Sequence, residues 1–166
     1  MMRKDKKRFK VAMIGHKRVP SREGGIEVVV EELSVRMVER GLKVDVYNRK
    51  DRFGKAYKQP REYKGIRIIQ IPTFKVSALN AFVYSVLASF RALFGGYDCI
   101  HYHAEGPCAM MWLPKLFGIH TVATIHGLDW QRAKWGGFST KYLKLGEKCA
   151  SKYADELIVL SLSLIH

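Results

Sequence analysis

Cysteine is sparse in this chain. The three cysteines, Cys99, Cys108 and Cys149, are odd in number and share no motif spacing. Such a pattern argues against a disulfide framework and against a zinc site, and it favours a reducing compartment. The sequence therefore predicts a cytoplasmic protein.

A secretory leader is also lacking. The apolar run "VAMIG" that follows the basic N-terminus is shorter than a signal peptide requires. Residues 1–8 are predicted to form a basic, disordered arm. Residues 9–166 have the length and composition of one domain.

Acidic residues are few. The chain has 15 Asp and Glu against 29 Lys and Arg, which gives a formal net charge of +14. This excess favours an anionic partner, and nucleic acid, anionic lipid and a phosphorylated ligand all qualify. A solvated basic surface is the alternative. Nucleic acid is the least favoured partner, because the basic residues are scattered and no helix–turn–helix, RNP or zinc pattern is present.

The common nucleotide-binding motifs are missing. The pair Gly24-Gly25 stands far from Gly15, so no G-x-G-x-x-G forms, and there is no Walker pattern. The strand expected at 43–48 leads into Asn48 and two basic residues, where a nicotinamide-cofactor protein usually carries an acid. These absences argue against a dinucleotide-dependent dehydrogenase.

Long apolar runs are rare, and the exception is 77–96. This segment is near the length of a membrane-spanning helix, but Asn80 and Arg91 lie inside it. We expect a helix buried against a sheet, with a thin polar strip that includes Ser85 and Ser89. A helix that also touches a membrane or a partner is the alternative.

Apolar strands and helices alternate along the whole chain. Strands are expected at 9–15, 43–48, 66–72, 98–103, 120–126 and 155–161, and helices at 26–41, 77–96, 107–118 and 138–154. Residues 49–65 are expected to form an extended loop. This order predicts an α/β fold: a doubly wound, mostly parallel sheet with helices on both faces.

Ligands bind such a sheet at the carboxyl ends of its strands. The first of these loops ends in Gly24 and Gly25, just before a helix whose free N–H groups suit a phosphate or a sugar hydroxyl. The alternative is that the two glycines only shape a turn.

The fourth strand ends in a second candidate loop. His101 and His103 are expected on one face of that strand, because strand side chains alternate. Metal binding with His126 is conceivable, but no ligand spacing supports it. Glu105 follows the strand and could bind a hydroxyl or act as a base. The alternative is that it is a solvated turn residue.

The fifth strand ends in the richest loop, "IHGLDWQRAKWGG". His126 stands at the strand tip, Gly127 allows a sharp exit, and Asp129 can accept hydrogen bonds from hydroxyls. Arg132 suits a phosphate, and Trp130 offers a flat face to a sugar ring or a lipid. The alternative is that the loop's tryptophans pack it down while Asp129 caps a short helix.

Together these loops resemble the N-terminal domain of family 4 glycosyltransferases with the GT-B fold. The matching stretches are "KVAMIGHKRVPSREGGIE", "DCIHYHAEGP", "TIHGLDWQRAKWG" and "ADELIVLS", in this order and each at a strand end. The resemblance covers residues 9 to 161 and implies a Rossmann-like domain, the first of two that face each other across a cleft.

The resemblance implies a retaining transfer from a nucleotide-sugar donor, with no metal and no further cofactor. Gly24 and Gly25 would approach the donor, and His126 would lie beside the reacting sugar as the catalytic candidate. Glu105 and Asp129 would be acceptor-side residues. The acceptor would be a glycan or a lipid-linked sugar.

The family's second, nucleotide-binding half is not in these 166 residues, so we expect negligible transfer by the chain alone. A truncated reading frame and a separate C-terminal half both fit this expectation. A membrane-recruitment or partner subunit of a split enzyme is the alternative function. The basic arm and a lysine stripe on the helix at 138–154 fit a peripheral position at an anionic inner membrane face.

Overall fold

The computed structural model describes residues 8–51, 59–73, 77–127 and 137–160. The strands are β1 (Lys10–Ile14), β2 (Lys43–Asp51), β3 (Glu62–Tyr63), β4 (Ile66–Thr73), β5 (Cys99–His103), β6 (His120–Ile125) and β7 (Glu156–Val159). The helices are α1 (Gly25–Glu39), α2 (Ser77–Leu93), α3 (Glu105–Cys108), α4 (Trp112–Leu116) and α5 (Gly137–Tyr153). The predicted basic arm lies outside the described residues except for Arg8.

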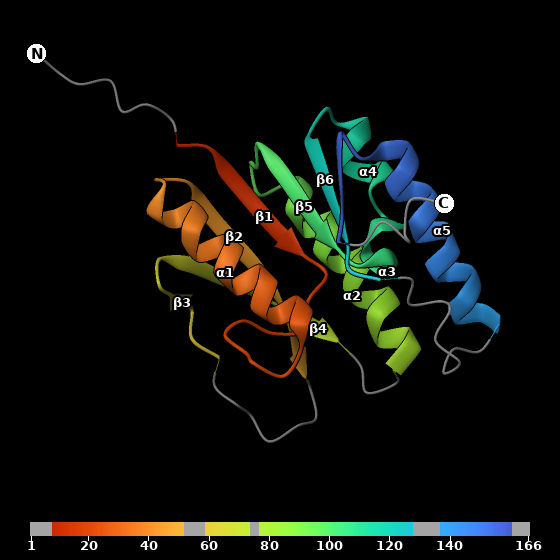
Figure 1. Cartoon of the computed structure of the whole chain (residues 1–166), viewed down its shortest axis with the longest axis horizontal. Helices are drawn as coiled ribbons and strands as arrows, with labels where there is room; N and C mark the ends of the chain where they lie inside the picture. Colours follow the sequence, from red (N-terminus) through yellow and green to blue (C-terminus); the bar gives the residue numbers. More distant parts are fainter. Residues whose placement is uncertain (1–7, 52–58, 74–76, 128–136, 161–166) are drawn as a thin grey trace, which may run out of the picture.

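The strands form one sheet in the order β3-β4-β2-β1-β5-β6-β7. Every neighbouring pair is parallel except β3 with β4. The predicted doubly wound, mostly parallel fold is therefore confirmed (Figure 1).

The interpretation of 49–65 as a loop is wrong at both ends. Strand β2 continues to Asp51, and β3 forms an antiparallel hairpin with β4. Arg49 pairs with Ile71, and Lys50 with Pro72. A backbone ladder needs no apolar side chains, so the polar composition of this segment concealed the strand.

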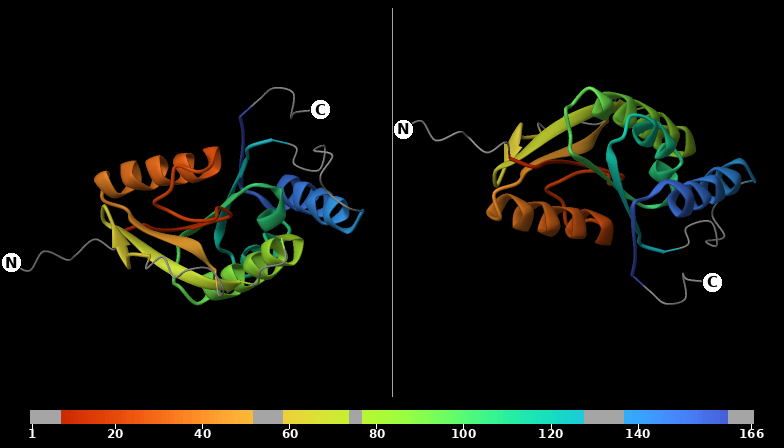
Figure 2. Two further views of the ribbon diagram at one scale, coloured as in Figure 1. Left: turned by 90° about the horizontal axis from the view of Figure 1, so that it is seen from below. Right: turned by 90° about the horizontal axis from the view of Figure 1, so that it is seen from above.

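Helices cover both faces of the sheet. Helix α1 lies on one face, and α2 lies on the other face with α5 (Figure 2). Val30 of α1 packs with the β1 side chains Val11 and Met13 in one core cluster. Tyr84 and Ala88 of α2 belong to the second cluster, which extends to α5. The two cores hold the carboxyl ends of the strands in fixed positions.

Helix α2 faces the sheet with the side that was expected to be polar. Ser85 and Ser89 are fully buried. The Ser85 hydroxyl donates to the Ala81 carbonyl, and the Tyr102 hydroxyl donates to Ser89. Small side chains let the helix approach the sheet closely, where the sheet's own tyrosine fills the interior. The prediction of a helix packed against the sheet is therefore confirmed. The outer side of α2 is nevertheless apolar and exposed, at Leu79, Phe82, Leu87 and Phe90.

Helix α5 packs through a glycine. A Cβ at Gly146 would lie 1.9 Å from the backbone oxygen of Glu105, so α5 contacts α3 with its backbone. Leu143 and Cys149 are buried beside this contact. Two other apolar side chains of this helix, Phe138 and Leu145, are exposed.

One further helix differs from expectation. The single helix expected at 107–118 is divided into α3 and α4, with a turn between them. Strand β7 lies at the edge of the sheet and leaves Leu157 and Ile158 about half exposed. Within the described ranges, no helix is both long and apolar enough to cross a bilayer.

Candidate functional site at the carboxyl edge of the sheet

Strands β1 and β5 meet closely where each one ends. A Cβ at Gly15 would lie 1.9 Å from the His103 carbonyl oxygen, and Gly15 has φ +123°. Helix α1 follows β1 onto one face, while α3 follows β5 onto the other and contacts α2 and α5. The gap between β1 and β5 is therefore the switch point of the sheet, where a doubly wound fold binds its ligand.

A row of imidazole rings reaches this switch point. His101 stacks on His103 with 4.2 Å between ring centroids, which confirms that the two share one face of β5. His103 Nδ1 lies 3.2 Å from His126 Nε2, and His101 Nε2 lies 2.7 Å from the Thr124 hydroxyl. The row begins inside the sheet and ends at the half-buried His126.

The inner rings of the row are neutral at pH 7. Burial lowers the pKa of His101 to about 4, and His126 lowers it further. Burial also holds the pKa of His103 well below its usual value. Since neither ring carries charge, His103 acts on His126 as a neutral hydrogen-bond partner. Among the residues that the structure describes, the buried Nε2 atom of His103 has no hydrogen-bond partner.

Glu105 is fully buried. Its orientation depends on Ala104, which has φ 71° and ψ 160°. This backbone conformation is rare for a residue with a Cβ and costs on the order of 1–3 kcal/mol. The Ala104 N–H donates to the Thr124 carbonyl, which joins this turn to β6. The interpretation of Glu105 as a solvated turn residue is therefore wrong.

The two glycines at the start of α1, Gly24 and Gly25, have different surroundings. Gly24 precedes α1, and a Cβ there would lie 2.1 Å from the Glu27 carboxylate. That carboxylate accepts a hydrogen bond from the Lys17 N–H at 3.0 Å, so contacts within the loop explain Gly24. Gly25 is exposed, and a Cβ there would meet nothing within 4 Å. Gly25 thus leaves open space at the N-terminus of α1.

Two groups at the end of β2 were missed as site residues. Asn48 fixes the first loop: its side chain contacts His16 Nε2 at 2.9 Å and both backbone groups of Val19. The Arg49 guanidinium lies over the Tyr84 ring at 4.8 Å, and burial lowers its pKa. The sequence signal was the basic residue at a strand end where dinucleotide-binding proteins carry an acid.

The structure thus brings Gly24, Gly25, Glu105 and His126 to one edge of the sheet. Gly127 follows His126 with open space around its α-carbon. Asp129 and Arg132 lie outside the described residues. Within the described ranges, no group of three His, Cys, Asp or Glu side chains is arranged to hold a metal ion.

Known proteins share both the sequence and the fold. Over 126 residues, the chain is 30% identical to D-inositol 3-phosphate glycosyltransferase of Thermobifida fusca, covering 64% of this chain and 28% of that protein. Sucrose-phosphate synthase from Thermosynechococcus elongatus superimposes with a TM-score of 0.66 at 21% identity, over 93% of this chain and 43% of that one.

The chain therefore spans less than half the length of either relative. The solved structure supports the fold, a GT-B type Rossmann-like domain. The model of Glycosyltransferase Family 4 matches residues 23–164, which is most of the chain. The chain belongs to Glycosyltransferase Family 4.

Proposed function

We propose that this chain is the N-terminal, acceptor-side domain of a retaining glycosyltransferase. It would transfer a sugar from a nucleotide-sugar donor to a glycan or a lipid-linked acceptor. Family membership supports the reaction class. The observation that carries the proposal is the row of neutral histidines that ends at His126, at the switch point of the sheet.

His126 is the catalytic candidate in this proposal. Its Nε2 is engaged by His103, which fixes the orientation of the ring. A fixed, uncharged partner such as His103 suits a histidine that hydrogen-bonds to a sugar hydroxyl, because no strong charge is set against the donor's phosphates. Asp129 would accept hydrogen bonds from acceptor hydroxyls, and Gly127 would let the acceptor approach. Glu105, whose side chain is fully buried, would support the turn between β5 and α3 and would not contact the acceptor directly.

The anionic part of the donor would meet the basic side of the site. Gly25 leaves room for it at the N-terminus of α1, where free N–H groups favour negative charge. Gly24 shapes the loop that presents this helix end. Arg49 adds a cation with little water around it, and Arg132 would add another from the following loop.

Donor binding in this proposal also needs a second Rossmann-like domain, from the same polypeptide or a separate one. The test is a sugar-transfer assay with these 166 residues, with and without a C-terminal family 4 domain. We expect transfer only with both parts. We also expect His126→Ala to reduce kcat by at least about 100-fold, the lower range for a positioned catalytic group.

Exposed Arg40, at the far end of α1, supplies the control. Arg40→Gln should leave transfer unchanged. Robust turnover by the 166 residues alone would contradict the two-domain proposal. Full activity of His126→Ala would remove His126 from the catalytic role. Addition of a chelator should leave the rate unchanged, since no metal is part of the proposal.

A further inference from the structure

The hydrogen bond between His103 Nδ1 and His126 Nε2 allows two positions for its proton. A neutral imidazole carries a hydrogen on one ring nitrogen and a lone pair on the other. If His103 supplies the proton, its own Nε2 is a lone pair. If His126 supplies it, His103 accepts with Nδ1 and must carry its hydrogen on Nε2. The surroundings of the two rings therefore decide where each hydrogen lies.

The Nε2 atom of His103 distinguishes the two arrangements. His103 is fully buried, and burial holds its pKa well below the usual value, so the ring is neutral. Its Nε2 atom has no hydrogen-bond partner among the described residues. A buried N–H group without an acceptor is rarer in folded proteins than a buried acceptor without a donor. Nε2 is therefore the lone pair, and the hydrogen of His103 lies on Nδ1.

A second buried histidine, His16, follows the same rule. Burial lowers its pKa to about 4, so this ring is also neutral. His16 Nε2 lies 2.9 Å from Asn48 Oδ1. The same oxygen accepts the Val19 N–H, while the Asn48 amide nitrogen donates to the Val19 carbonyl, so the amide orientation is fixed. His16 must then donate from Nε2, and its lone pair is on Nδ1, which again has no partner in the described part of the chain.

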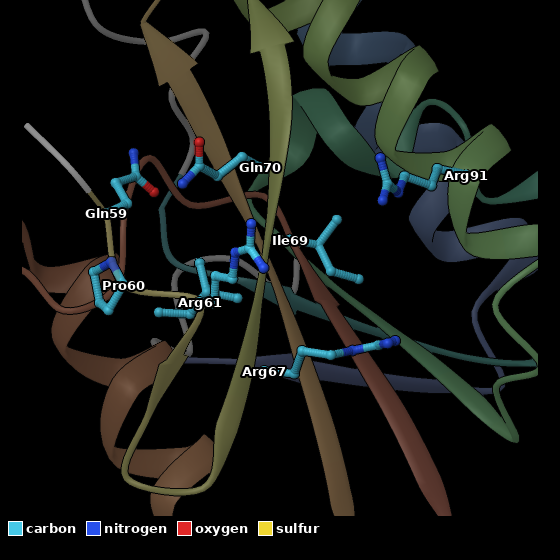
Figure 3. A pocket seen from close by; sticks show the side chains of 8 residues that line it. Gln59, Pro60, Arg61, Arg67, Ile69, Gln70 and Arg91 are labelled. Carbon is cyan, nitrogen blue, oxygen red and sulfur yellow. The ribbon is translucent and has the colours of Figure 1, made fainter. Parts of the chain in front are cut away.

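Gln59 holds the Asn48 amide from a further side. The Asn48 amide nitrogen also donates to Gln59 Oε1 at 2.9 Å, and Gln59 Nε2 donates to the Arg49 carbonyl at 3.1 Å. Figure 3 shows Gln59 among the side chains that line the hollow beside β4. The proton of His16 is thus assigned from the backbone groups of Val19 and Arg49, whose roles as donor and acceptor are unambiguous.

We infer that His103 is a positioning residue that fixes the proton of His126. His103 Nδ1 donates to His126 Nε2, so a neutral His126 carries its hydrogen on Nδ1. His126 then meets a ligand as a hydrogen-bond donor. It takes an oxygen with a lone pair, such as a sugar hydroxyl or a phosphoryl oxygen, and disfavours a protonated amine. The use of this donor in sugar transfer rests on the proposed function, whereas the position of the proton does not.

This assignment excludes one catalytic role for His126. A general base needs a lone pair that faces the hydroxyl from which it takes a proton. The lone pair of His126 lies on Nε2 and faces the Nδ1–H of His103. His126 can therefore stabilise charge that develops on an oxygen, as a preorganised donor. It cannot remove a proton from the acceptor.

The test is a long-range proton–nitrogen NMR spectrum of the isotope-labelled 166-residue chain at about pH 8, where an ordinary histidine is neutral. The spectrum shows which nitrogen of each ring carries the hydrogen. We expect Nδ1–H for His103 and His126. We expect the opposite form, Nε2–H, for His16, which serves as the internal control. His126→Gln identifies the signals of His126 by their loss.

Two variants of similar size separate the hydrogen bond from the packing. His103→Leu removes the donor, so the hydrogen of His126 should no longer be confined to Nδ1. His103→Asn supplies an amide N–H and should keep it there. In the two-domain enzyme, kcat/KM of His103→Leu should be about fivefold below that of His103→Asn, the effect of one hydrogen bond. His120→Asn, at a half-exposed histidine in β6, should change neither the His126 signals nor the rate.

The spectrum and the rates test different statements. An Nε2–H signal for His126 in the wild-type chain would overturn the inference, whatever the activity. Identical His126 signals in the wild type and His103→Leu would also overturn it, because His103 would not be the residue that holds the proton. An Nδ1–H signal in a two-domain enzyme that transfers no sugar would support the inference and contradict the proposed function. Circular dichroism checks the folding of His103→Leu, and the wild-type spectrum decides the tautomer without it.

Discussion

At the candidate site, two neighbouring glycines are explained differently: one by packing within the protein, the other by the proposed ligand. Gly24 and Gly25 are equivalent in the sequence, yet the structure gives them different surroundings. Gly24 lies against the Glu27 carboxylate, whereas Gly25 has open space around its α-carbon. A glycine that no neighbour requires, at a helix start beside the site, is best explained by a ligand that approaches the backbone.

This difference predicts opposite effects of two alanine substitutions. Gly24→Ala should lower the free energy of unfolding by about 1–2 kcal/mol, because the new methyl group pushes on a buried carboxylate. Gly25→Ala should leave stability unchanged but raise the KM for the donor by tenfold or more in the two-domain enzyme. Denaturant unfolding and steady-state kinetics measure the two effects. An unchanged KM in Gly25→Ala would remove this glycine from the donor site.

At the scale of elements, the sequence predicted most strands and helices but not always their faces. The long apolar run located α2 and its packing against the sheet. Because apolar residues lie on nearly every side of this helix, the run did not show which side faces inward. The buried side of α2 uses Ser85 and Ser89, which hydrogen-bond within the core. The sequence also identified two candidate site residues at strand ends: Glu105 after β5 and His126 after β6. Arg49 was missed because its segment looked like a loop.

The close contact between helices α5 and α3 predicts how two glycine substitutions in α5 affect stability. Gly146→Ala should destabilise the domain by about 2–3 kcal/mol, because its methyl group cannot avoid the Glu105 backbone oxygen without moving the helix. Gly137, at the start of the same helix, has open space around it. Gly137→Ala should therefore unfold at the wild-type denaturant midpoint or slightly above it. Equal midpoints for the two variants would contradict this packing.

At the scale of the whole molecule, buried histidines link stability to pH. Burial lowers the pKa of His16 and of His101 to about 4, from a usual value of 6.5. Between these two values the unfolded chain binds protons that the folded chain does not. The free energy of unfolding is therefore highest above pH 6.5 and falls as the pH drops toward 4.

We expect each of these two histidines to contribute about 1.4 kcal/mol of lost stability per pH unit in that window. Urea unfolding at a series of pH values measures the slope. The double variant His16→Gln/His101→Gln should show a shallower slope. The low pKa of Asp155, about 2, affects stability only below about pH 4. A constant urea midpoint from pH 6.5 to 4.5 would contradict the assignment of neutral, buried rings.

The close approach of Gly15 to the His103 carbonyl has a further consequence. Backbone atoms, not side chains, set the spacing of β1 and β5 at the candidate site. Substitutions in the surrounding loops can therefore alter what the site accepts without widening or narrowing its frame. If the proposed acceptor-side role holds, exchange of loops between relatives should change the acceptor preference on this scaffold, provided that position 15 remains glycine.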